Sequence, residues 1–281
     1  MARPSLAAAG RRRSRGFALL IVLWTLVLIA FIVAHITANG RTEIRIADNL
    51  VDNAVARAAA DGAISAAIFN LANPRPEQRW PLGGAPRQLA VGDSRIELRL
   101  EDEASRINPN LAPPPLLQAL LQTLGANPQL AQRLAGAIAE WVGTAEDQRP
   151  PEAILADYRA AGLDYQPPGS PLESLDELGR VLGVTPAMLA ALRPHLSLFA
   201  PAEPSRQGSD PLVAAAAARV AQSGGDATTP AQSAPPEVAT VRIAAVAFGP
   251  GQARVQRVAV VRAGPALPNG YTILAWADRL D

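Results

Sequence analysis

The sequence predicts an α+β fold in which one long helix packs on an antiparallel sheet and a large helical segment is inserted into that sheet. Three observations support this prediction. Residues 19–73 contain no proline and consist mainly of helix-forming residues. Strand patterns, with strict alternation or clustered valines, lie at residues 94–101 and again near the carboxyl end. Between these strands, short apolar segments separated by Gly and Pro predict several short helices.

The amino-terminal region predicts a membrane anchor. Residues 1–16 contain five arginines and no acidic residue, and residues 17–36 are apolar apart from Thr25 and His35. About twenty apolar residues match the hydrocarbon thickness of a bilayer, and the arginines place the first residues in the cytoplasm. We expect His35 at the far membrane interface and the rest of the chain in a periplasm. The alternative is a cleaved secretory or twin-arginine signal, although signal peptides have a shorter apolar core.

The predicted helix continues beyond the membrane. From residue 37 to residue 73, apolar residues recur at spacings of three and four, with charged residues mostly between them. Pro74 and Pro76 end this pattern. We therefore expect one continuous helix of about 55 residues, roughly 80 Å long. Its second half has an alanine-rich apolar face, which we expect to pack on a folded domain.

The sheet is expected to draw its strands from both ends of the exported body. Residues 94–101 alternate between Ile or Leu and Arg or Glu, which is typical of a half-buried strand. Residues 237–248, 253–262 and 271–276 are three further strand candidates, separated by Gly-Pro-Gly and Pro-Asn-Gly turn signals. The first part of the sheet is thus placed within residues 74–101 and its last strands within residues 237–281.

Residues 102–200 are expected to form a helical insertion. Five helices are predicted in it, at residues 116–124, 129–141, 152–161, 174–182 and 186–192. The last two predict a helix–hairpin–helix unit with Gly183 at the turn and Thr185 capping the second helix. Such hairpins bind DNA phosphates in some proteins, but residues 103–199 contain ten acidic residues and six arginines, which argues against phosphate binding. We therefore expect the hairpin to be a packing element.

Residues 201–236 are rich in Ala, Pro, Ser, Gly and Gln. Apart from an alanine-rich helix predicted at residues 210–222, this stretch is expected to be a flexible surface insertion before the last strands. It lacks the periodic apolar pattern of a separate domain.

The composition removes several classes of chemistry. The chain has 281 residues, no cysteine and a formal net charge of +1, and all of its 26 basic residues are arginine. It therefore has no disulfide, no thiolate, and no lysine for a phosphate loop or a Schiff base. Only His35 and His195 can act as imidazole bases or metal ligands. No Ser–His–Asp pattern supports an exported hydrolase, so an enzyme is not expected.

One short motif connects the amino end to a known family. Arg15-Gly16-Phe17-Ala18-Leu19-Leu20 resembles the cleavage and methylation motif of type IV pilins and type II secretion pseudopilins. The resemblance implies a pilin-like fold. It also implies that a prepilin peptidase cuts after Gly16 on the cytoplasmic side and that the new amino terminus, Phe17, is methylated. Residues 1–16 are then a prepilin leader, residues 17–36 the transmembrane helix, and residues 37–73 its periplasmic continuation.

The fifth mature position departs from the usual pilin pattern. Ordinary pilins have a glutamate there, which pairs in assembly models with the amino-terminal charge of the preceding subunit; this chain has Ile21. An unpaired carboxylate in hydrocarbon costs at least about 2.5–3.5 kcal/mol. Loss of the glutamate therefore suits a subunit with no predecessor, at the tip of a filament. The minor pseudopilin family called general secretion pathway protein K shows this feature.

Three further stretches resemble the protein K family. These are Asp102 to Asn110, which enters its helical insertion, residues 172–178, and Tyr271 to Trp276 at the carboxyl end. The resemblance implies a SAM-like helical insertion. It also implies a minor pseudopilin that caps the tip of the type II secretion pseudopilus and helps to start its assembly for export of folded proteins. Its expected partners are the I- and J-type minor pseudopilins, other pseudopilins, prepilin peptidase, the inner membrane and, by family position, secreted substrates.

Calcium is the one cofactor that the resemblance raises. Family members often place aspartates two and four residues after the tryptophan that ends a helix; matched on Trp141, these positions are Gly143 and Ala145 here. Ca²⁺ takes six to eight oxygen ligands. Nearby acids at 146, 147, 152 and 157 can supply some of them, but they are also ordinary loop acids, and no ligand is assigned.

The alternative function is a membrane-anchored helix–hairpin–helix module that binds DNA during uptake. Salt-dependent DNA binding by residues 40–281 would support this alternative over the pseudopilin.

Overall fold

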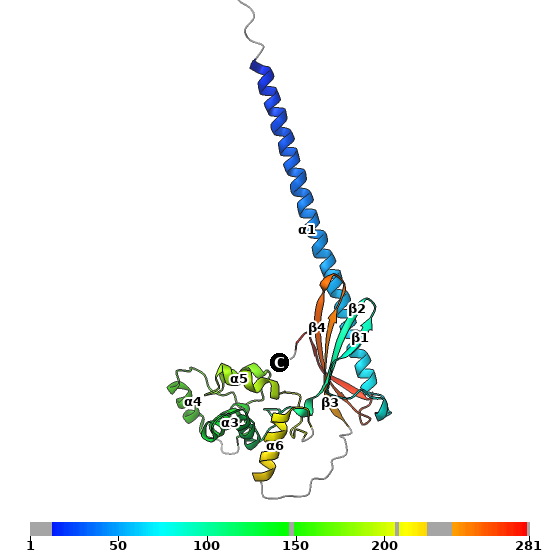
Figure 1. Ribbon diagram of the computed structural model, residues 1–281. Helices are drawn as coiled ribbons and strands as arrows, with labels where there is room; N and C mark the ends of the chain where they lie inside the picture. Colours follow the sequence, from blue (N-terminus) through cyan, green and yellow to red (C-terminus); the bar gives the residue numbers. More distant parts are fainter. Residues whose placement is uncertain (1–12, 146–148, 206–207, 224–237, 280–281) are drawn as a thin grey trace, which may run out of the picture. The chain divides into compact units, whose positions relative to one another are not determined.

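The computed structural model describes residues 13–145, 149–205, 208–223 and 238–279, without the side chains of residues 13–16 and 36–42. The chain divides into two compact units, residues 1–54 and residues 55–281. The helix α1 (Arg13–Leu71) contributes to both units (Figure 1). The continuous helix predicted from residue 19 is therefore confirmed. It begins six residues earlier than expected and ends at Leu71, shortly before Pro74.

The second unit contains an antiparallel sheet of five strands in the order β1-β2-β3-β4-β5. The strands are β1 (Arg87–Val91), β2 (Ser94–Asp102), β3 (Ala239–Phe248), β4 (Arg254–Ala263) and β5 (Tyr271–Ala277). The four predicted strands are thus confirmed within one or two residues at their ends. β1 was not predicted, because its five residues show no apolar alternation; it pairs with β2 from Arg87 opposite Leu98 to Val91 opposite Ser94.

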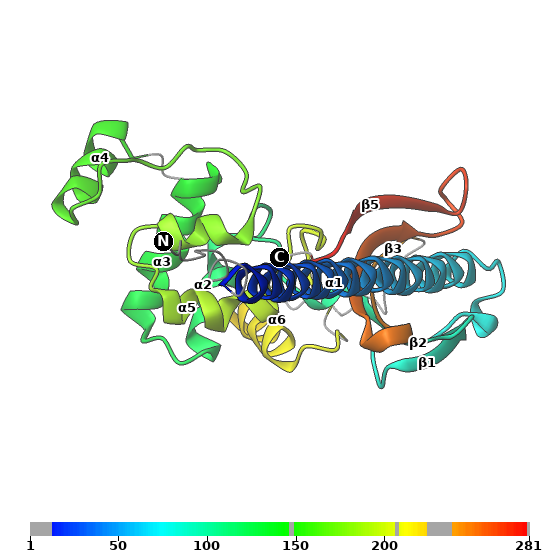
Figure 2. The same cartoon turned by 90° about the horizontal axis from the view of Figure 1, so that it is seen from above.

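α1 packs on one face of this sheet through small side chains. Figure 2 shows β1 and β2 on one side of α1 and β5 on the other. The helix contributes mainly alanines to the shared core, and the strands contribute Ile, Leu, Val and Ala. The buried members are Ala56, Ala59, Ala60, Ala63, Ile64, Ala67, Ile68 and Leu71 from α1, and Ile96, Leu98, Leu100, Val241, Ile243, Ala245, Ala247, Ala259, Val261 and Ala263 from the sheet. Alanines allow the helix axis to approach the sheet closely, which is the packing that the Ala-rich pattern predicted.

The helical lobe lies between β2 and β3 in the sequence. Its helices are α2 (Pro114–Thr123), α3 (Pro128–Val142), α4 (Pro151–Ala160), α5 (Pro186–Leu192) and α6 (Pro211–Ser223), with short 3₁₀ turns η2 (Glu103–Ser105), η3 (Leu175–Arg180) and η4 (Arg193–His195). Two further 3₁₀ turns, η1 (Pro76–Gln78) and η5 (Pro250–Gln252), lie beside the strands. The lobe has its own continuous apolar core, separate from the core under α1.

The start of the lobe is joined to the segment that follows α5. The amide of Ile107 donates to the carbonyl of His195 at 2.9 Å, and the amide of Ser197 donates to the carbonyl of Ile107 at 3.0 Å. The buried Asn108 side chain donates to the carbonyls of Leu198 and Ala200, both at 2.9 Å. Residues 107–108 and 195–200 therefore lie side by side.

Two expectations about the lobe need correction. Residues 174–182 were expected to form an ordinary helix, but they contain the 3₁₀ turn η3, which Ser174 begins with a capping box to Glu177. Residues 210–222 were expected to form an alanine-rich helix within a surface insertion. They form the helix α6 (Figure 2), and its Val213 and Ala216 are buried in the core of the lobe, not at the surface. α6 is therefore part of the lobe; residues 206–207 and 224–237 lie outside the described residues.

Candidate functional site

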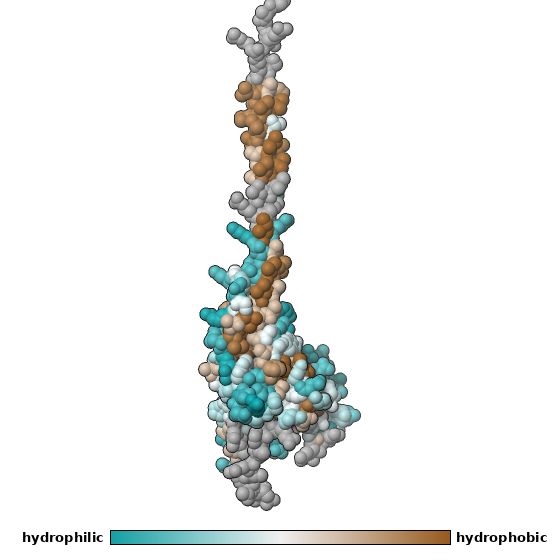
Figure 3. Space-filling model, turned by 90° about the vertical axis from the view of Figure 1, so that its right-hand side faces the viewer, coloured by the Kyte–Doolittle hydropathy of each residue, from teal (hydrophilic) through white to brown (hydrophobic). Residues whose placement is uncertain are grey.

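The exposed apolar part of α1 dominates the first unit. Phe17–His35 has a mean hydropathy of 3.0, none of it is buried by other described residues, and its length suffices to cross a membrane once. Figure 3 shows a hydrophobic surface along the visible face of this segment. An apolar surface of this size is stable in lipid or against the apolar faces of other helices, but not in water.

Polar side chains do not prevent this segment from entering lipid. The hydroxyl of Thr25 donates to the carbonyls of Ile21 at 3.0 Å and Val22 at 2.9 Å, so it is satisfied by its own helix. The rings of Phe31 and His35 stack with their centroids 6.3 Å apart. His35 is the last residue of the apolar segment.

The three residues predicted for processing and assembly lie on this helix. Gly16 and Phe17 are consecutive residues in the helical backbone, and Phe17 is the first residue of the apolar segment. The side chains of Phe17 and Ile21 are exposed, and they share one face because they are four residues apart. The structure therefore presents both side chains to any surface that covers this face of α1.

A buried arginine connects α1 to the strands β4 and β5 at one end of the sheet. Arg257 lies on β4 in the row of core-facing residues, and its side chain is only 10% exposed. Its Nε donates to Asp61 Oδ1 on α1 at 2.7 Å, and its Nη1 pairs with Asp278 after β5. Trp276 Nε1 also donates to Asp61 Oδ1, at 3.0 Å. We call these four side chains the α1 clasp, because they link α1, β4 and the end of β5.

Two groups of the clasp, Arg257 and Asp278, have a shifted pKa. Burial lowers the pKa of Arg257, but the hydrogen bonds and charges of Asp61 and Asp278 outweigh burial and raise this pKa above its ordinary value. The hydrogen bond from Arg257 lowers the pKa of Asp278. Arg257 therefore stays charged, and sequence reasoning missed it because an arginine inside a strand pattern reads as a solvent-facing residue.

The buried Glu103 forms a second charged cluster, where β2 leads into the lobe. Its Oε1 accepts from Arg106 Nη1 at 3.1 Å and from Arg242 Nε, on β3, at 2.5 Å. Arg106 also pairs with Glu101 at 2.5 Å. The neighbouring Asp102 caps η2 through the amide of Ala104, and burial raises the pKa of its carboxyl. These contacts connect the sheet to the first turn of the lobe.

A polar cavity of about 310 Å³ lies beside this cluster and is lined by a histidine, aspartates and two serines, which are residue types found in catalytic triads. His195 Nδ1 lies 2.5 Å from Asp210 Oδ2, and Ser105 and Ser209 line the same cavity. Asp210 Oδ1 accepts from the amides of Leu212 and Val213, and Ser105 Oγ accepts from the Ser209 amide at 2.9 Å. Asp210 thus caps the first turn of α6 while its other oxygen faces His195.

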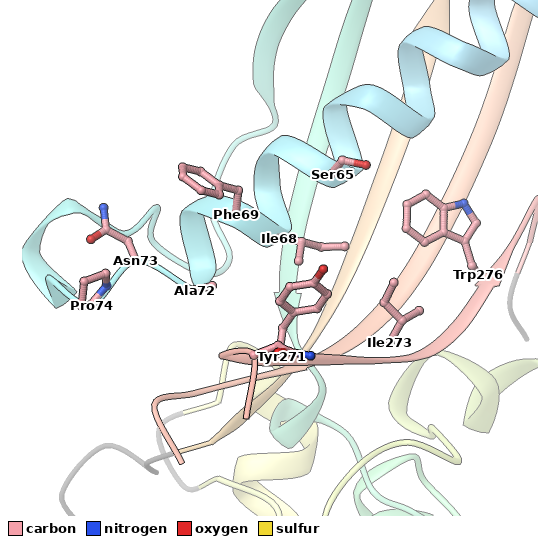
Figure 4. Close-up of a pocket in the computed structure, with 10 residues that line it drawn as sticks. Ser65, Ile68, Phe69, Ala72, Asn73, Pro74, Tyr271, Ile273 and Trp276 are labelled. Carbon is pink, nitrogen blue, oxygen red and sulfur yellow. The ribbon is translucent and has the colours of Figure 1, made fainter. Parts of the chain in front are cut away.

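An apolar groove of about 550 Å³ lies between the end of α1 and the edge strand β5. Figure 4 shows Ile68 and Phe69 on the helix and Tyr271, Ile273 and Trp276 on the strand. Phe69 is 83% exposed. No charged residue lines this groove, and most of its lining is apolar.

The helix–hairpin–helix unit is packed against the lobe. Gly183 has a positive φ of +86°, and a Cβ there would meet Leu134 of α3 at 3.3 Å. Thr185 caps α5 as predicted, with its hydroxyl accepting from the amide of Met188 at 3.3 Å. Arg193, which follows α5, pairs with Asp176 of η3. This arginine is neutralised within the hairpin, which weakens any contact with a phosphate backbone.

At the two matched positions of the calcium site that the resemblance raised, this chain has no carboxylate. Gly143 has φ +77° and closes α3, and a Cβ at this position would lie 2.6 Å from the carbonyl oxygen of Gly169. An aspartate therefore has no room there, and Ala145 supplies no side-chain oxygen. Among the described residues, no three His, Asp or Glu side chains gather as a metal site. Glu146 and Asp147 lie outside the described residues.

Comparison with known proteins agrees with the sequence motifs. Residues 94–201, which span β2 and the helical lobe, match the family model for type II secretion system (T2SS) protein K. A relative described as type II secretion system protein K from Klebsiella pneumoniae is 27% identical over 212 residues, covering 67% of this chain and 64% of the relative. The chain thus covers less than two thirds of that relative's length.

The fold also has a known counterpart. A chain in the crystal structure of the GspK-GspI-GspJ complex from the enterotoxigenic Escherichia coli type 2 secretion system matches with a TM-score of 0.55 and 16% identity. The match covers 85% of this chain and 98% of that chain. This likeness concerns the fold. Together, the comparisons confirm that the chain resembles protein K in sequence and has a fold found in that complex.

Proposed function

We propose that this chain is a minor pseudopilin of a type II secretion system, which caps the pseudopilus tip and helps to start its assembly for export of folded proteins across the outer membrane. The observation that carries the proposal is α1. A 19-residue apolar segment continues without a break into a helix that packs on a sheet, and the following segment is similar to protein K. The role is structural, and no catalysis is proposed.

The proposed topology follows from the same helix. Phe17–His35 crosses the inner membrane once, residues 1–16 with their five arginines stay in the cytoplasm, and the sheet and lobe lie in the periplasm. Prepilin peptidase cuts the Gly16–Phe17 bond on the cytoplasmic side, and the new amino group of Phe17 is methylated. The mature chain then begins at the first residue of the apolar segment, without the charged leader.

The proposed partners are I- and J-type minor pseudopilins, together with other pseudopilins of the filament. Support comes from the fold shared with a chain of the GspK-GspI-GspJ complex. The exposed apolar face of α1 that includes Phe17 and Ile21 can pack against equivalent helices when the subunit leaves the lipid. Contact with secreted substrates is a further element of the proposal and rests on family position alone.

Ile21 is the residue that supports a position of this subunit at the tip of the pseudopilus. A glutamate at this place would need a partner in the apolar core, because an unpaired carboxylate there costs at least about 2.5–3.5 kcal/mol. Ile21 is instead an exposed apolar side chain on an apolar helix face. It needs no charged partner, which fits a subunit that enters the filament first.

Processing can be tested by intact mass. The full chain is co-expressed with a prepilin peptidase, and we expect a product that begins at Phe17. The Gly16→Leu variant should stay uncut, and Gly10→Leu, in the same leader, should be cut normally. A product cut after residue 34 would instead indicate a conventional signal peptide and would contradict the proposed anchor.

The tip position can be tested by placing a charge at position 21. We expect Ile21→Glu to insert into the membrane but to reduce secretion of cargo, because the new carboxylate lacks a partner at the tip. Ile21→Ala is the matched uncharged control and should secrete normally. Normal secretion by Ile21→Glu, with normal protein levels, would contradict the tip argument while leaving the pseudopilin proposal intact.

A further inference from the structure

We propose that the outer face of the sheet, which is the face turned away from α1, carries a binding site for acidic side chains of a partner protein. The site consists of Arg95 on β2, Phe248 on β3 and Arg254 on β4, and we call it the Arg–Phe–Arg row. This inference does not depend on the proposed function, because it rests only on the contacts of these three residues within the second unit.

The three side chains form one row across neighbouring strands. β2, β3 and β4 follow each other in the sheet (Figure 1), and Arg95 and Arg254 are both register partners of Phe248. The adjacent residues on β2 and β3, Ile96 and Ala247, are buried in the core under α1. Because successive side chains of a strand point to opposite faces of the sheet, the Arg–Phe–Arg row lies on the outer face.

Both guanidinium groups lie over the same aromatic ring. The Cζ atoms of Arg95 and Arg254 are 4.9 and 5.7 Å from the centroid of the Phe248 ring. A cation within about 6 Å of such a centroid is attracted to the ring. This attraction restricts two long side chains that would otherwise lose rotamer entropy when they bind a ligand. The ring therefore positions both guanidinium groups before a ligand arrives.

The turn between β3 and β4 supports the row. Phe248 is the last residue of β3, and Arg254 is the first residue of β4. The amide of Gly249 donates to the carbonyl of Ala253 at 2.8 Å, and the amide of Ala253 donates to the carbonyl of Pro250 at 2.9 Å. These hydrogen bonds close the turn directly beyond the row and keep Phe248 and Arg254 opposite each other. The row is thus built on paired strands, which hold a site more precisely than loops do.

The row carries two positive charges that no described carboxylate neutralises. Arg95 and Arg254 are exposed, and among the residues that the structure describes neither forms an ion pair with an Asp or Glu. Glu97, two residues further along β2 on the same face, accepts instead from Gln88 Nε2 at 3.4 Å. Two like charges over one ring repel each other, and an anion bound between them relieves this repulsion. The charge of the row is therefore complementary to that of a carboxylate.

An acidic protein segment is the ligand that suits the row best. A guanidinium is planar and binds a carboxylate through two parallel N–H···O bonds. The ring between the two guanidinium groups offers an apolar surface to the methylene groups of Asp or Glu side chains. Recognition of an anionic lipid surface is typical of clusters of about 4–8 Lys or Arg, whereas this row has two arginines and an aromatic ring. We therefore assign the row to a partner protein rather than to lipid.

Chemical modification of arginines in the full chain, in micelles of a nonionic detergent, tests the site. Phenylglyoxal modifies exposed arginines, and mass spectrometry of the digested chain gives the rate at each one. We expect about 4 mM hexaglutamate to slow the modification of Arg95 and Arg254 about 2- to 5-fold, which corresponds to a dissociation constant of roughly 1–4 mM. Arg99 and Arg262, exposed arginines further along β2 and β4 on the same face, are matched controls and should react at unchanged rates. Hexaglutamine at equal ionic strength should protect none of the four.

Two substitutions at Phe248 separate the positioning by the ring from the charge of the arginines. Phe248→Leu keeps both arginines but removes the ring, so hexaglutamate should bind about 2- to 5-fold more weakly, which is the size of an exposed cation–π interaction. Phe248→Tyr keeps an aromatic ring and should protect Arg95 and Arg254 as well as the wild-type chain does. Circular dichroism of both variants is recorded to confirm that the sheet is intact.

Three results would overturn the inference. One is equal protection by hexaglutamate at all four arginines, or at none, which would show that the row is not a distinct site. Another is wild-type protection in Phe248→Leu, which would show that the ring does not position the guanidinium groups. The third is protection of the row by vesicles of phosphatidylglycerol and phosphatidylcholine but not by hexaglutamate, which would indicate a lipid surface. None of these results bears on cleavage after Gly16, so the proposed function would stand or fall separately.

Discussion

The α1 clasp can be tested by removing its central acceptor. Asp61→Ala deletes the carboxylate that accepts from Arg257 Nε at 2.7 Å and from Trp276 Nε1 at 3.0 Å. Arg257 then remains in a site where its side chain is 10% exposed, with Asp278 as its remaining partner. The indole N–H of Trp276 loses the acceptor shown in the structure. The variant therefore removes the link that Asp61 makes from α1 to β4 and β5 without changing the apolar core, and Arg57 of α1 still pairs with Asp278 at 3.1 Å.

The expected loss can be bounded from the burial of the groups. A hydrogen bond to a charged group contributes about 1.5–3 kcal/mol, an exposed ion pair about 0–1, and breaking a fully buried pair about 3–5. The Asp61 side chain is 34% exposed, and Asp278 still neutralises part of the charge of Arg257 in the variant. The loss should therefore lie between the value for an exposed ion pair and the value for a fully buried one. We expect Asp61→Ala to lower the free energy of unfolding of the part of the chain that contains the end of α1 and the sheet by about 2–3 kcal/mol. At about 2–4 °C per kcal/mol, its melting temperature should fall by about 4–12 °C.

The assay combines thermal unfolding with hydrogen exchange on the full chain in detergent. Exchange should rise in the end of α1 and in β5, and it should stay unchanged in α3, because the lobe has a separate core. Asp48→Ala, which removes an exposed aspartate from the same helix, is the matched control. Asp61→Ala combined with Arg257→Met should be more stable than Asp61→Ala alone, because it removes the uncompensated buried charge. A change below about 0.5 kcal/mol for Asp61→Ala, or strictly additive effects in the double variant, would refute the clasp.

Two further substitutions test how local contacts set stability. Gly62→Ala should raise the free energy of unfolding, measured by thermal unfolding, by about 0.5–1 kcal/mol. Gly62 lies in an exposed helical position, and no atom lies within 4 Å of an added Cβ. A loss of stability in this variant would show that another contact requires glycine there. Asp102→Asn should stabilise the chain at neutral pH, because burial raises the pKa of Asp102 above its usual 3.8 and so penalises the ionised form, while Asn can still accept from Ala104. This advantage should shrink as pH falls through the raised pKa towards 3.8 and vanish below it, and an advantage that grows on acidification would contradict the assigned cause.

Much of the fold could be predicted because its elements have strong local patterns. The absence of proline over α1, the alternation of β2 and the turn signals before β4 and β5 each depend on neighbouring residues alone. β1 could not be predicted because Arg87–Val91 pairs with β2 through backbone hydrogen bonds, and its side chains show no alternating apolar pattern that indicates a strand. α6 was predicted as a helix but assigned to a surface insertion, because an alanine-rich helix with few large apolar residues gives little sign of what it packs against.

The candidate sites divide in the same way. Gly16, Phe17 and Ile21 form a linear motif, so their order along the chain was sufficient to single them out. The pairing of Arg257 with Asp61 joins residues far apart in the sequence, and the pairing of His195 with Asp210 depends on where α6 begins. Both pairs consist of residue types that are common on surfaces, so the chain order does not distinguish them from solvated side chains.

The linear order of residues alone is enough to define a membrane-directed helix, because hydrophobicity and helix propensity act over a few neighbouring residues. It also defines the strands that alternate and the motif at the leader. Which arginine is buried beside the core and which glycine lies against another backbone depend on distances between segments that are remote in the sequence. Those distances exist only once α1, the sheet and the lobe have folded, since burial and charge compensation are properties of the packed chain.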